Sequence, residues 1–316
     1  LCIPALFQGT VWNVYGFKYD PASDHSSGRR IDRPGYGKTG GAAVMKKKIL
    51  TLLKYIFCIL LCLIVVIPFY MVLINSFKTK AEAARMSLSL PTEWVFANYS
   101  EVIEKGNLVQ GFFNSLTYAG IATFAGVILC GMAAFVLCRN RTKLNVFLYY
   151  FFLCGLFFPV NYVTLVRVLS TAHLNDTRIG IILVFTSAMI PFCVFTIRNF
   201  VISVPVELDE AAVIDGAGSV SLFFRIILPL LKPTMVTCFI LQFMSVWSDF
   251  LTPLYLSSKS KLFPMTMSVY QFFGKNKNYW NYIFADIVLT CLPVIIVYMI
   301  GQKYIVGGMT SGAVKE

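Results

Sequence analysis

Residues 210–229 read EAAVIDGAGSVSLFFRIILP and lie between two long apolar segments. Charges at the density found here are costly in lipid, so this stretch is predicted to lie at a membrane surface between two spanning segments. The charged residues in the stretch and beside it are Glu207, Asp209, Glu210, Asp215, Arg225 and Lys232.

Local signals predict a helix-turn-helix in this region. Ser203 is a candidate N-cap, Pro205 suits a first turn, and the acidic residues that follow complement the positive end of a helix dipole. Gly216 and Gly218 are predicted to end the first helix by adopting positive φ. A second helix is expected over residues 219–228. Its apolar stripe would consist of Leu222, Phe223, Ile226 and Ile227. Such a unit is too short to fold alone and too charged to insert, so we expect it to be presented to another protein.

Composition predicts a membrane protein independently of this stretch. Hydrophobic residues make up 57% of the 316 residues and charged residues only 13%, against roughly 25% charged residues in soluble domains. Six apolar runs reach the ~20 residues that a spanning helix needs. They lie near 50–76, 112–138, 144–169, 179–203, 230–256 and 282–306. The expected fold is an all-α, polytopic bundle of six transmembrane helices with a surface loop over residues 204–229.

Basic residues indicate the orientation of this bundle. Lys46, Lys47 and Lys48 precede the first run, and Arg139 and Arg141 lie in the short link between the second and third runs. The positive-inside rule places both regions in the cytoplasm, together with the 204–229 loop and the C-terminus. The net charge of +12 does not indicate nucleic-acid binding, because these charges flank the apolar runs and form no basic stripe interleaved with aromatics.

Several chemistries have no support in the sequence. The nine cysteines lack metal-type CxxC spacing, and the two histidines are far apart, so neither a metal centre nor a catalytic triad is expected. Gly37, Lys38 and Thr39 resemble part of a phosphate loop, but the required glycine five residues earlier is Asp32. The chain is therefore predicted to be no enzyme and to hold no ATP site or other cofactor of its own.

Residues 1–44 differ in composition from the rest of the chain. They contain no spanning segment and include the polar run SSGRRIDRPGYGKTGG, rich in turn formers and basic residues. Met45 followed by three lysines would be a natural start for a membrane protein. We expect residues 1–44 to be a disordered extension or a mis-assigned start, and residues 45–316 to form the transmembrane domain.

The 210–229 stretch also resembles a known motif. Glu210-Ala211-Ala212, Gly216 six residues after the glutamate, and Ile226-x-Leu228-Pro229 are similar in order and spacing to the EAA loop of ABC-importer permeases. The resemblance is strongest to permeases of carbohydrate importers, in particular the smaller subunit of maltose-type systems. Further similar segments bring its extent to nearly all of 45–316. They are Asn75-Ser76-Phe77-Lys78, Leu90-Pro91, Trp94, Asn98-Tyr99 and Asn114-Ser115-Leu116. The family's Trp-Asn-Asp-Phe appears here as Trp247-Ser248-Asp249-Phe250, which removes an amide.

The resemblance implies contacts with an ATPase. The loop would be a coupling helix in a cleft of the ATPase subunit, with Glu210 beside a basic residue and Gly216 permitting close backbone approach. The implied coupling residues are Glu210, Ala211, Ala212, Asp215, Gly216, Ala217, Ile226, Leu228 and Pro229. A glycine-rich C-terminal tail would reach the ATPase dimer through Gly307, Gly308, Gly312 and Lys315.

The resemblance also implies the surrounding assembly. The partners would be two ATPase copies that bind ATP and Mg, a second homologous permease, an extracellular solute-binding protein and membrane lipid. The complex would lie in the cytoplasmic membrane of a bacterium or an archaeon and import sugars or oligosaccharides.

Candidates for the substrate pathway come from residue chemistry. A sugar route favours aromatic platforms with amide and hydroxyl groups, and an intramembrane acid often faces a cavity. The candidates are Asn161, Tyr162, Gln242, Ser245, Trp247 and Asp249. Interfacial aromatics and polar links between helices explain the same residue types equally well. An alternative function is an ion-coupled secondary transporter that uses Asp249 or Asp286, for which interrupted helices in internal repeats would be expected.

Overall fold

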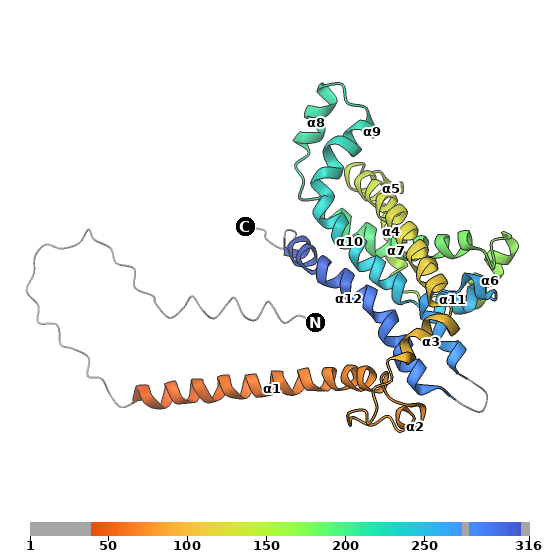
Figure 1. Ribbon diagram of the computed structural model, residues 1–316. Helices are drawn as coiled ribbons and strands as arrows, with labels where there is room; N and C mark the ends of the chain where they lie inside the picture. The colour runs from red at the N-terminus through yellow and green to blue at the C-terminus, as the bar shows by residue number, and fades with distance from the viewer. Residues whose placement is uncertain (1–38, 274–277, 311–316) are drawn as a thin grey trace, which may run out of the picture. The chain divides into compact units, whose positions relative to one another are not determined.

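The computed structural model describes residues 39–273 and 278–310. Within these ranges the chain is helical apart from its links and an isolated β-bridge between Phe273 and Asn278 (Figure 1). The longer helices are α1 (Thr39–Asn75), α3 (Ala97–Lys105), α4 (Leu108–Arg139), α5 (Lys143–Cys154), α6 (Tyr162–Thr171), α7 (Arg178–Val201), α8 (Glu207–Ile214), α10 (Leu228–Ser248) and α12 (Trp280–Thr310). Short elements are α2 (Lys80–Ala83), α9 (Ser219–Ser221), the π-helix η2 (Leu222–Ile227), α11 (Leu251–Leu256), and the 3-10 helices η3 (Ser260–Leu262) and η4 (Met265–Phe272).

The chain forms two units, residues 1–61 and residues 62–316, and the boundary falls inside α1. Residues 1–38 of the expected N-terminal extension lie outside the described residues. Residues 39–44 belong to α1, where we had expected extension rather than helix. The second unit contains the helical bundle.

Helices α4, α7, α10 and α12 form the bundle core. Helix α4 packs along α7 and α10, and α12 packs on α10 (Figure 1). Ala119, Ala122 and Ala134 of α4 are completely buried, which lets its neighbours approach closely. A Cβ atom on Gly126 of α4 would lie 2.3 Å from Sδ of Met189 on α7, so these two helices meet at a residue without a side chain.

Five helical segments in the described part of the chain are long and apolar enough to cross a membrane. They are Lys48–Asn75, Leu108–Arg139, Arg178–Val201, Ser219–Ser248 and Trp280–Ile305. These segments confirm the all-α polytopic class and five of the six expected spans.

The expected third span, 144–169, is wrong as a continuous helix. It is divided into α5 and α6 by residues 155–161. Pro159 lacks the N–H that a continuing helix needs. Gly155 lies so close to α7 that a Cβ atom on it would be 2.8 Å from Cγ of Pro191. The missing N–H of Pro159 and the packing of Gly155 against α7 therefore interrupt this apolar run, for which composition alone predicts one continuous helix.

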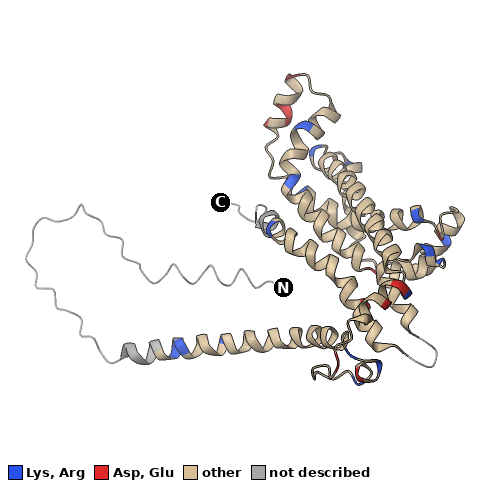
Figure 2. Cartoon of the chain, in the orientation of Figure 1, with Lys and Arg blue, Asp and Glu red and all other residues tan. Residues whose placement is uncertain are grey.

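Charged residues gather towards the two ends of the bundle and leave its middle largely uncharged (Figure 2). One end, here the α8 end, includes α8 and the C-terminal residue of α4, Arg139. The other, the α3 end, includes α3, η3 and η4. This separation is expected of a bundle whose middle crosses the hydrocarbon region.

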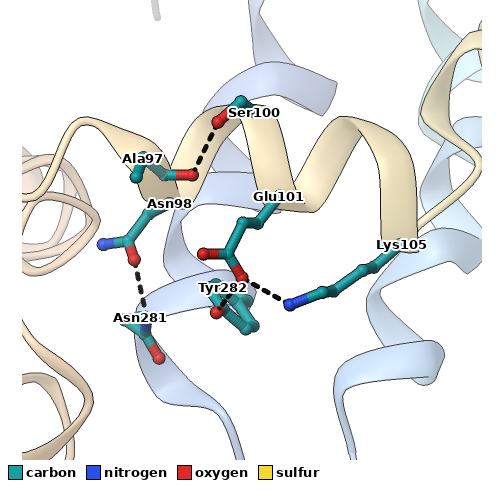
Figure 3. A network of polar contacts seen from close by, with 7 residues as sticks. All are labelled: Ala97, Asn98, Ser100, Glu101, Lys105, Asn281 and Tyr282. Atoms are coloured by element: carbon teal, nitrogen blue, oxygen red, sulfur yellow. Dashed lines mark hydrogen bonds and ion pairs between the residues drawn. The ribbon is translucent and has the colours of Figure 1, made fainter.

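Asparagine side chains connect the segments at the α3 end. Nδ2 of Asn98 donates hydrogen bonds to the carbonyl oxygens of Ser76 and Lys78, both at 2.9 Å. Nδ2 of Asn281 on α12 in turn donates to Oδ1 of Asn98 at 2.8 Å (Figure 3). Ser76, Lys78 and Asn98 belong to segments on which the sequence resemblance rests, and in the structure they connect those segments to one another.

Glu101 forms a second connection between α3 and α12. Its carboxylate accepts hydrogen bonds from Lys105 of the same helix and from the hydroxyl of Tyr282 (Figure 3). The hydrogen bond from Lys105, and then that from Tyr282, hold the pKa of Glu101 below its usual range. Glu101 therefore remains a charged link between α3 and α12 at neutral pH.

Polar side chains of α4 hold the segment that joins η3 to η4. Nδ2 of Asn114 donates to the carbonyl oxygens of Lys261 and Phe263, at 2.9 Å and 3.0 Å. The hydroxyl of Ser115 accepts from the backbone N–H of Met265 at 2.8 Å. These bonds satisfy backbone groups that a link outside regular helix would otherwise leave unpaired.

The start of α7 offers a test of packing. The hydroxyl of Thr177 accepts from the N–H of Gly180 at 3.0 Å and donates to the carbonyl of Leu174 at 2.6 Å. A Cβ atom at Gly180 would lie 2.2 Å from that carbonyl oxygen, so Gly180→Ala should displace backbone and destabilise the protein by about 1–3 kcal/mol. Gly120→Ala is the matched control, because its Cβ would meet nothing within 4 Å. Thermal unfolding in detergent should show a lower midpoint for Gly180→Ala only, and equal midpoints would contradict this account.

Candidate functional site

The first helix of the loop, α8, begins later than expected. The residue preceding it is Val206, with φ −71°, and no side chain caps it. Ser203 is not the N-cap, because its hydroxyl donates back to the carbonyl of Phe200 on α7 at 2.7 Å. The first turn is acidic as expected, which complements the positive end of the helix dipole.

Gly216 terminates α8 in the predicted way. Its φ is +82°, which confirms the expected left-handed conformation. The N–H of Gly216 donates to the carbonyl of Val213 at 3.0 Å, and the N–H of Ala217 donates to that of Ala212 at 2.9 Å. These two bonds form a Schellman motif, which favours glycine at the left-handed position. The same expectation is wrong for Gly218, whose φ is −71°.

The second part of the loop continues directly into a spanning helix. Helix α9, the π-helix η2 and α10 follow one another without a break, so the expected separate helix ending at Leu228 is wrong. The N–H of Leu228 donates to the carbonyl of Phe223, five residues back, as a π-helix requires. Pro229 lies in the first turn of α10. The predicted apolar stripe is confirmed, with Leu222, Phe223 and Ile227 buried and Ile226 half-buried.

Helix α8 presents an acidic and apolar surface. Glu210 is exposed, and its carboxylate makes no hydrogen bond or ion pair with residues 39–273 or 278–310. Val213 and Ile214 are 60% and 84% exposed, unusually high for aliphatic side chains. A Cβ atom on Gly216 would meet nothing within 4 Å, so within this chain glycine is required by conformation and not by space. Ala211 and Asp215 are exposed, Ala217 and Leu228 are half-buried, and Ala212 is buried.

Arg139 connects α8 to the bundle. Its Nε lies 2.6 Å from Oδ2 of Asp209, and its Nη2 donates to the carbonyl oxygen of Val204 at 2.9 Å. In the sequence, Arg139 indicates only the orientation in the membrane, and Asp209 only the acidic first turn of a helix. The available signals were an arginine in the last turn of an apolar helix and an acid beside the EAA residues.

The predicted pathway residues fall into separate groups. Asn161 is exposed and caps α6, because its Oδ1 accepts from the N–H of Thr164 at 3.1 Å. The ring of Tyr162 stacks on that of Tyr255, with centroids 4.7 Å apart. Gln242 is half-buried and Ser245 is exposed, three residues apart on α10, so these two share one face of that helix.

Trp247 and Asp249 have structural partners within the chain. Trp247 is 2% exposed, and its Nε1 donates to the carbonyl of Thr290 at 3.2 Å. The carboxylate of Asp249 accepts from the backbone N–H of Thr252 at 3.1 Å and from its hydroxyl at 2.6 Å, at the start of α11. A pathway role for these residues, as for the other four, stays a prediction.

Only part of the predicted C-terminal contact region lies within the described residues. Helix α12 continues through Gly307 and Gly308 to Thr310, beyond the expected 282–306 span and into the part expected to be a glycine-rich tail. Gly312 and Lys315 lie outside the described residues. Contact between this region and an ATPase stays a prediction.

The described residues contain no group of three or more His, Cys, Asp or Glu side chains arranged to hold a metal ion. Cys130, Cys193 and Cys238 are buried in the bundle core and form no disulfide. They act there as small packing residues.

Several helices able to cross a membrane and an exposed loop between two of them define a polytopic membrane component. Residues 125–311 match the family described as "Binding-protein-dependent transport system inner membrane component", and the chain belongs to this family. It is 33% identical over 252 residues to the "Melibiose/raffinose/stachyose import permease protein MelC" of Bacillus subtilis (strain 168), covering 79% of this chain and 91% of that protein.

Other comparisons agree in sequence and in fold. The "Diacetylchitobiose uptake system permease protein NgcG" of Streptomyces coelicolor (strain ATCC BAA-471 / A3(2) / M145) is 32% identical over 295 residues, covering 92% of this chain and 98% of that protein. A chain from a bacterial ABC transporter involved in the import of alginate has a TM-score of 0.73 at 20% identity, covering 86% of this chain and 99% of that chain. At that identity the structural likeness concerns the fold alone.

Proposed function

We propose that this chain is the permease subunit of an ATP-driven importer of sugars or oligosaccharides. Family membership supports transport that depends on a binding protein. Two relatives above 30% identity carry names of melibiose, raffinose, stachyose and diacetylchitobiose uptake, which supports carbohydrate as the substrate class. The chain forms part of the transport pathway and transmits movement to it. A partner ATPase binds the ATP and Mg.

The observation that carries this proposal is the surface of α8. Glu210 is exposed and unpaired within the described residues, beside the highly exposed Ile214 and the left-handed Gly216. An exposed carboxylate with adjacent aliphatic side chains suits docking into a cleft that has a basic residue. Closure of an ATPase dimer would displace α8 and reorient the spans. Such coupling requires that the contact energy at α8 differ between the nucleotide states.

The remaining partners follow from the same proposal. A second homologous permease completes the pathway, and an extracellular solute-binding protein delivers the substrate. The α8 end lies in the cytoplasm, supported by Arg139, Arg141 and Lys143 at that end. The C-terminal residues Gly307, Gly308, Gly312 and Lys315 approach the ATPase dimer from the same side.

Helix α10 is the best-supported pathway element. Gln242 and Ser245 form a polar face on a helix long enough to span the membrane, and such a face suits a second subunit or a sugar route more than lipid. The ion-coupled alternative gains no support. Asp249 caps α11, and Oδ1 of Asp286 accepts a hydrogen bond from Ser268 at 2.6 Å.

The proposal predicts strict ATP dependence. The purified chain alone should hydrolyse no ATP, and proteoliposomes of the full complex should take up sugar only with hydrolysable ATP and the binding protein. An ATPase-dead partner should abolish uptake. The control imposes a proton or sodium gradient without ATP, and uptake under that condition would favour the ion-coupled alternative.

A further inference from the structure

We infer that Arg139 is a positioning residue that transmits the displacement of α8 to the spanning helix α4. This inference rests on the proposed function. Arg139 is the last residue of α4, and Asp209 lies in the first turn of α8. Their ion pair is therefore a direct link between the end of a spanning helix and the loop element proposed to meet the ATPase.

The guanidinium of Arg139 binds three points of the chain. Its Nε contacts Oδ2 of Asp209 at 2.6 Å, and its Nη2 donates to the carbonyl oxygens of Val204 and Pro205 at 2.9 Å and 3.4 Å. Those carbonyls belong to the link between α7 and α8. One side chain thus joins α4, the link between α7 and α8, and α8 itself. A guanidinium suits this task because its donors lie in one rigid plane, which an ammonium cannot reproduce.

Burial strengthens the ion pair between Arg139 and Asp209. The side chains of Arg139 and Asp209 are only 16% and 12% exposed, so salt and water screen the pair less than they screen a surface ion pair. The other carboxylate oxygen of Asp209, Oδ1, is buried and has no hydrogen-bond partner among the described residues. Among the described residues, Arg139 is therefore the one side chain that holds the carboxylate of Asp209.

Helix α8 is also attached to a second spanning helix, α10. Asp209 and Ala212 are the buried residues of α8, and α8 packs on η2, which continues into α10. Without the ion pair, α8 would keep its contact with the η2–α10 helix, and Arg139 would hold only the carbonyl oxygens of the link before α8. A movement of α8 would then reach α10 but no longer reach α4 directly.

The test uses the reconstituted complex of this chain with its partner permease, ATPase and binding protein. Arg139→Gln and Asp209→Asn each remove the ion pair, Asp209→Asn with almost no change in size, and Asp209→Glu keeps the charge. Arg141→Gln is the matched control, because Arg141 is exposed and makes no hydrogen bond with the described residues. The readout is the number of sugar molecules imported per ATP hydrolysed, measured beside the amount of ATPase that co-purifies.

We expect Arg139→Gln and Asp209→Asn to lower this ratio about tenfold while the ATPase still co-purifies, because a buried charge-assisted bond is lost. Asp209→Glu should restore most of the ratio, and Arg141→Gln should match wild type. An unchanged ratio in both pair-breaking variants would overturn the inference. So would a loss of ATPase binding that accounts fully for the loss of import, since the pair would then serve only to maintain structure.

The wild-type complex separates this result from the proposed function. If wild type imports no sugar with ATP, the proposed function itself fails. If wild type is active, the ratios decide the role of Arg139 alone. If the Arg139→Gln complex does not assemble, the test compares Asp209→Asn with Asp209→Glu. These variants change the other partner of the ion pair, and Asp209→Glu should restore what Asp209→Asn loses.

Discussion

Gly216→Val is expected to abolish coupled transport while leaving the chain inserted in the membrane. Gly216 has φ +82°, and its N–H and that of Ala217 close the Schellman motif that ends α8. A β-branched residue in this conformation costs about 1–3 kcal/mol, which α8, with eight residues and little burial, is poorly able to absorb. The end of α8 should unwind, and the surface proposed for the ATPase should lose its shape.

Gly218→Val is the matched control for this variant. Both glycines have open space around the position of a Cβ atom, but Gly218 has φ −71°. Gly216→Asn should be intermediate, since asparagine tolerates the left-handed region better than valine. Co-purification of the ATPase and amide hydrogen exchange across α8 provide the measurement. Equal behaviour of Gly216→Val and Gly218→Val would show that backbone conformation at 216 is not the requirement.

Glu210→Ala is expected to weaken ATPase docking without affecting the fold. The carboxylate of Glu210 is exposed and makes no hydrogen bond or ion pair with the described residues, so its removal takes no contact from the bundle. A charge-assisted hydrogen bond at a partly buried interface is worth roughly 1.5–3 kcal/mol, and each 1.4 kcal/mol is about a tenfold change in affinity. We therefore expect an affinity for the ATPase about 10- to 100-fold lower.

Glu104→Ala controls for the loss of a carboxylate alone. Glu104 is exposed on α3, at the other end of the bundle. Titration of the detergent-solubilised permease pair with ATPase should show weaker binding for Glu210→Ala and wild-type binding for Glu104→Ala. If Glu210→Ala binds and transports as wild type does, α8 is not the coupling element.

Local chemistry accounts for what could be predicted from the sequence. Five of the six apolar runs correspond to helices long and apolar enough to span a membrane, as their length and composition predicted. The left-handed conformation at Gly216 was also predictable, since a glycine after a short acidic helix is a local end signal. The similarity of the 210–229 stretch to the EAA loop led to the family that residues 125–311 match.

Local signals failed where neighbouring helices intervene. The 144–169 run is divided between α5 and α6 where Gly155 packs against Pro191 of α7, a contact that composition does not reveal. Ser203 had the chemistry of an N-cap, but its hydroxyl binds the end of α7 instead. The second part of the loop joins α10 through a π-helix, because burial of Phe223 and Ile227 favours continuation over a break.

The sequence by itself determined the class of the protein, five of its spanning segments and the position of the exposed loop, because hydropathy, charge and glycine conformation act over a few residues. Only the tertiary structure decided how that loop is attached. Arg139 and Asp209 lie 70 residues apart, and two long helices must fold back on one another before their side chains meet. An ion pair of that kind depends on helix length and packing angle, which no local pattern specifies.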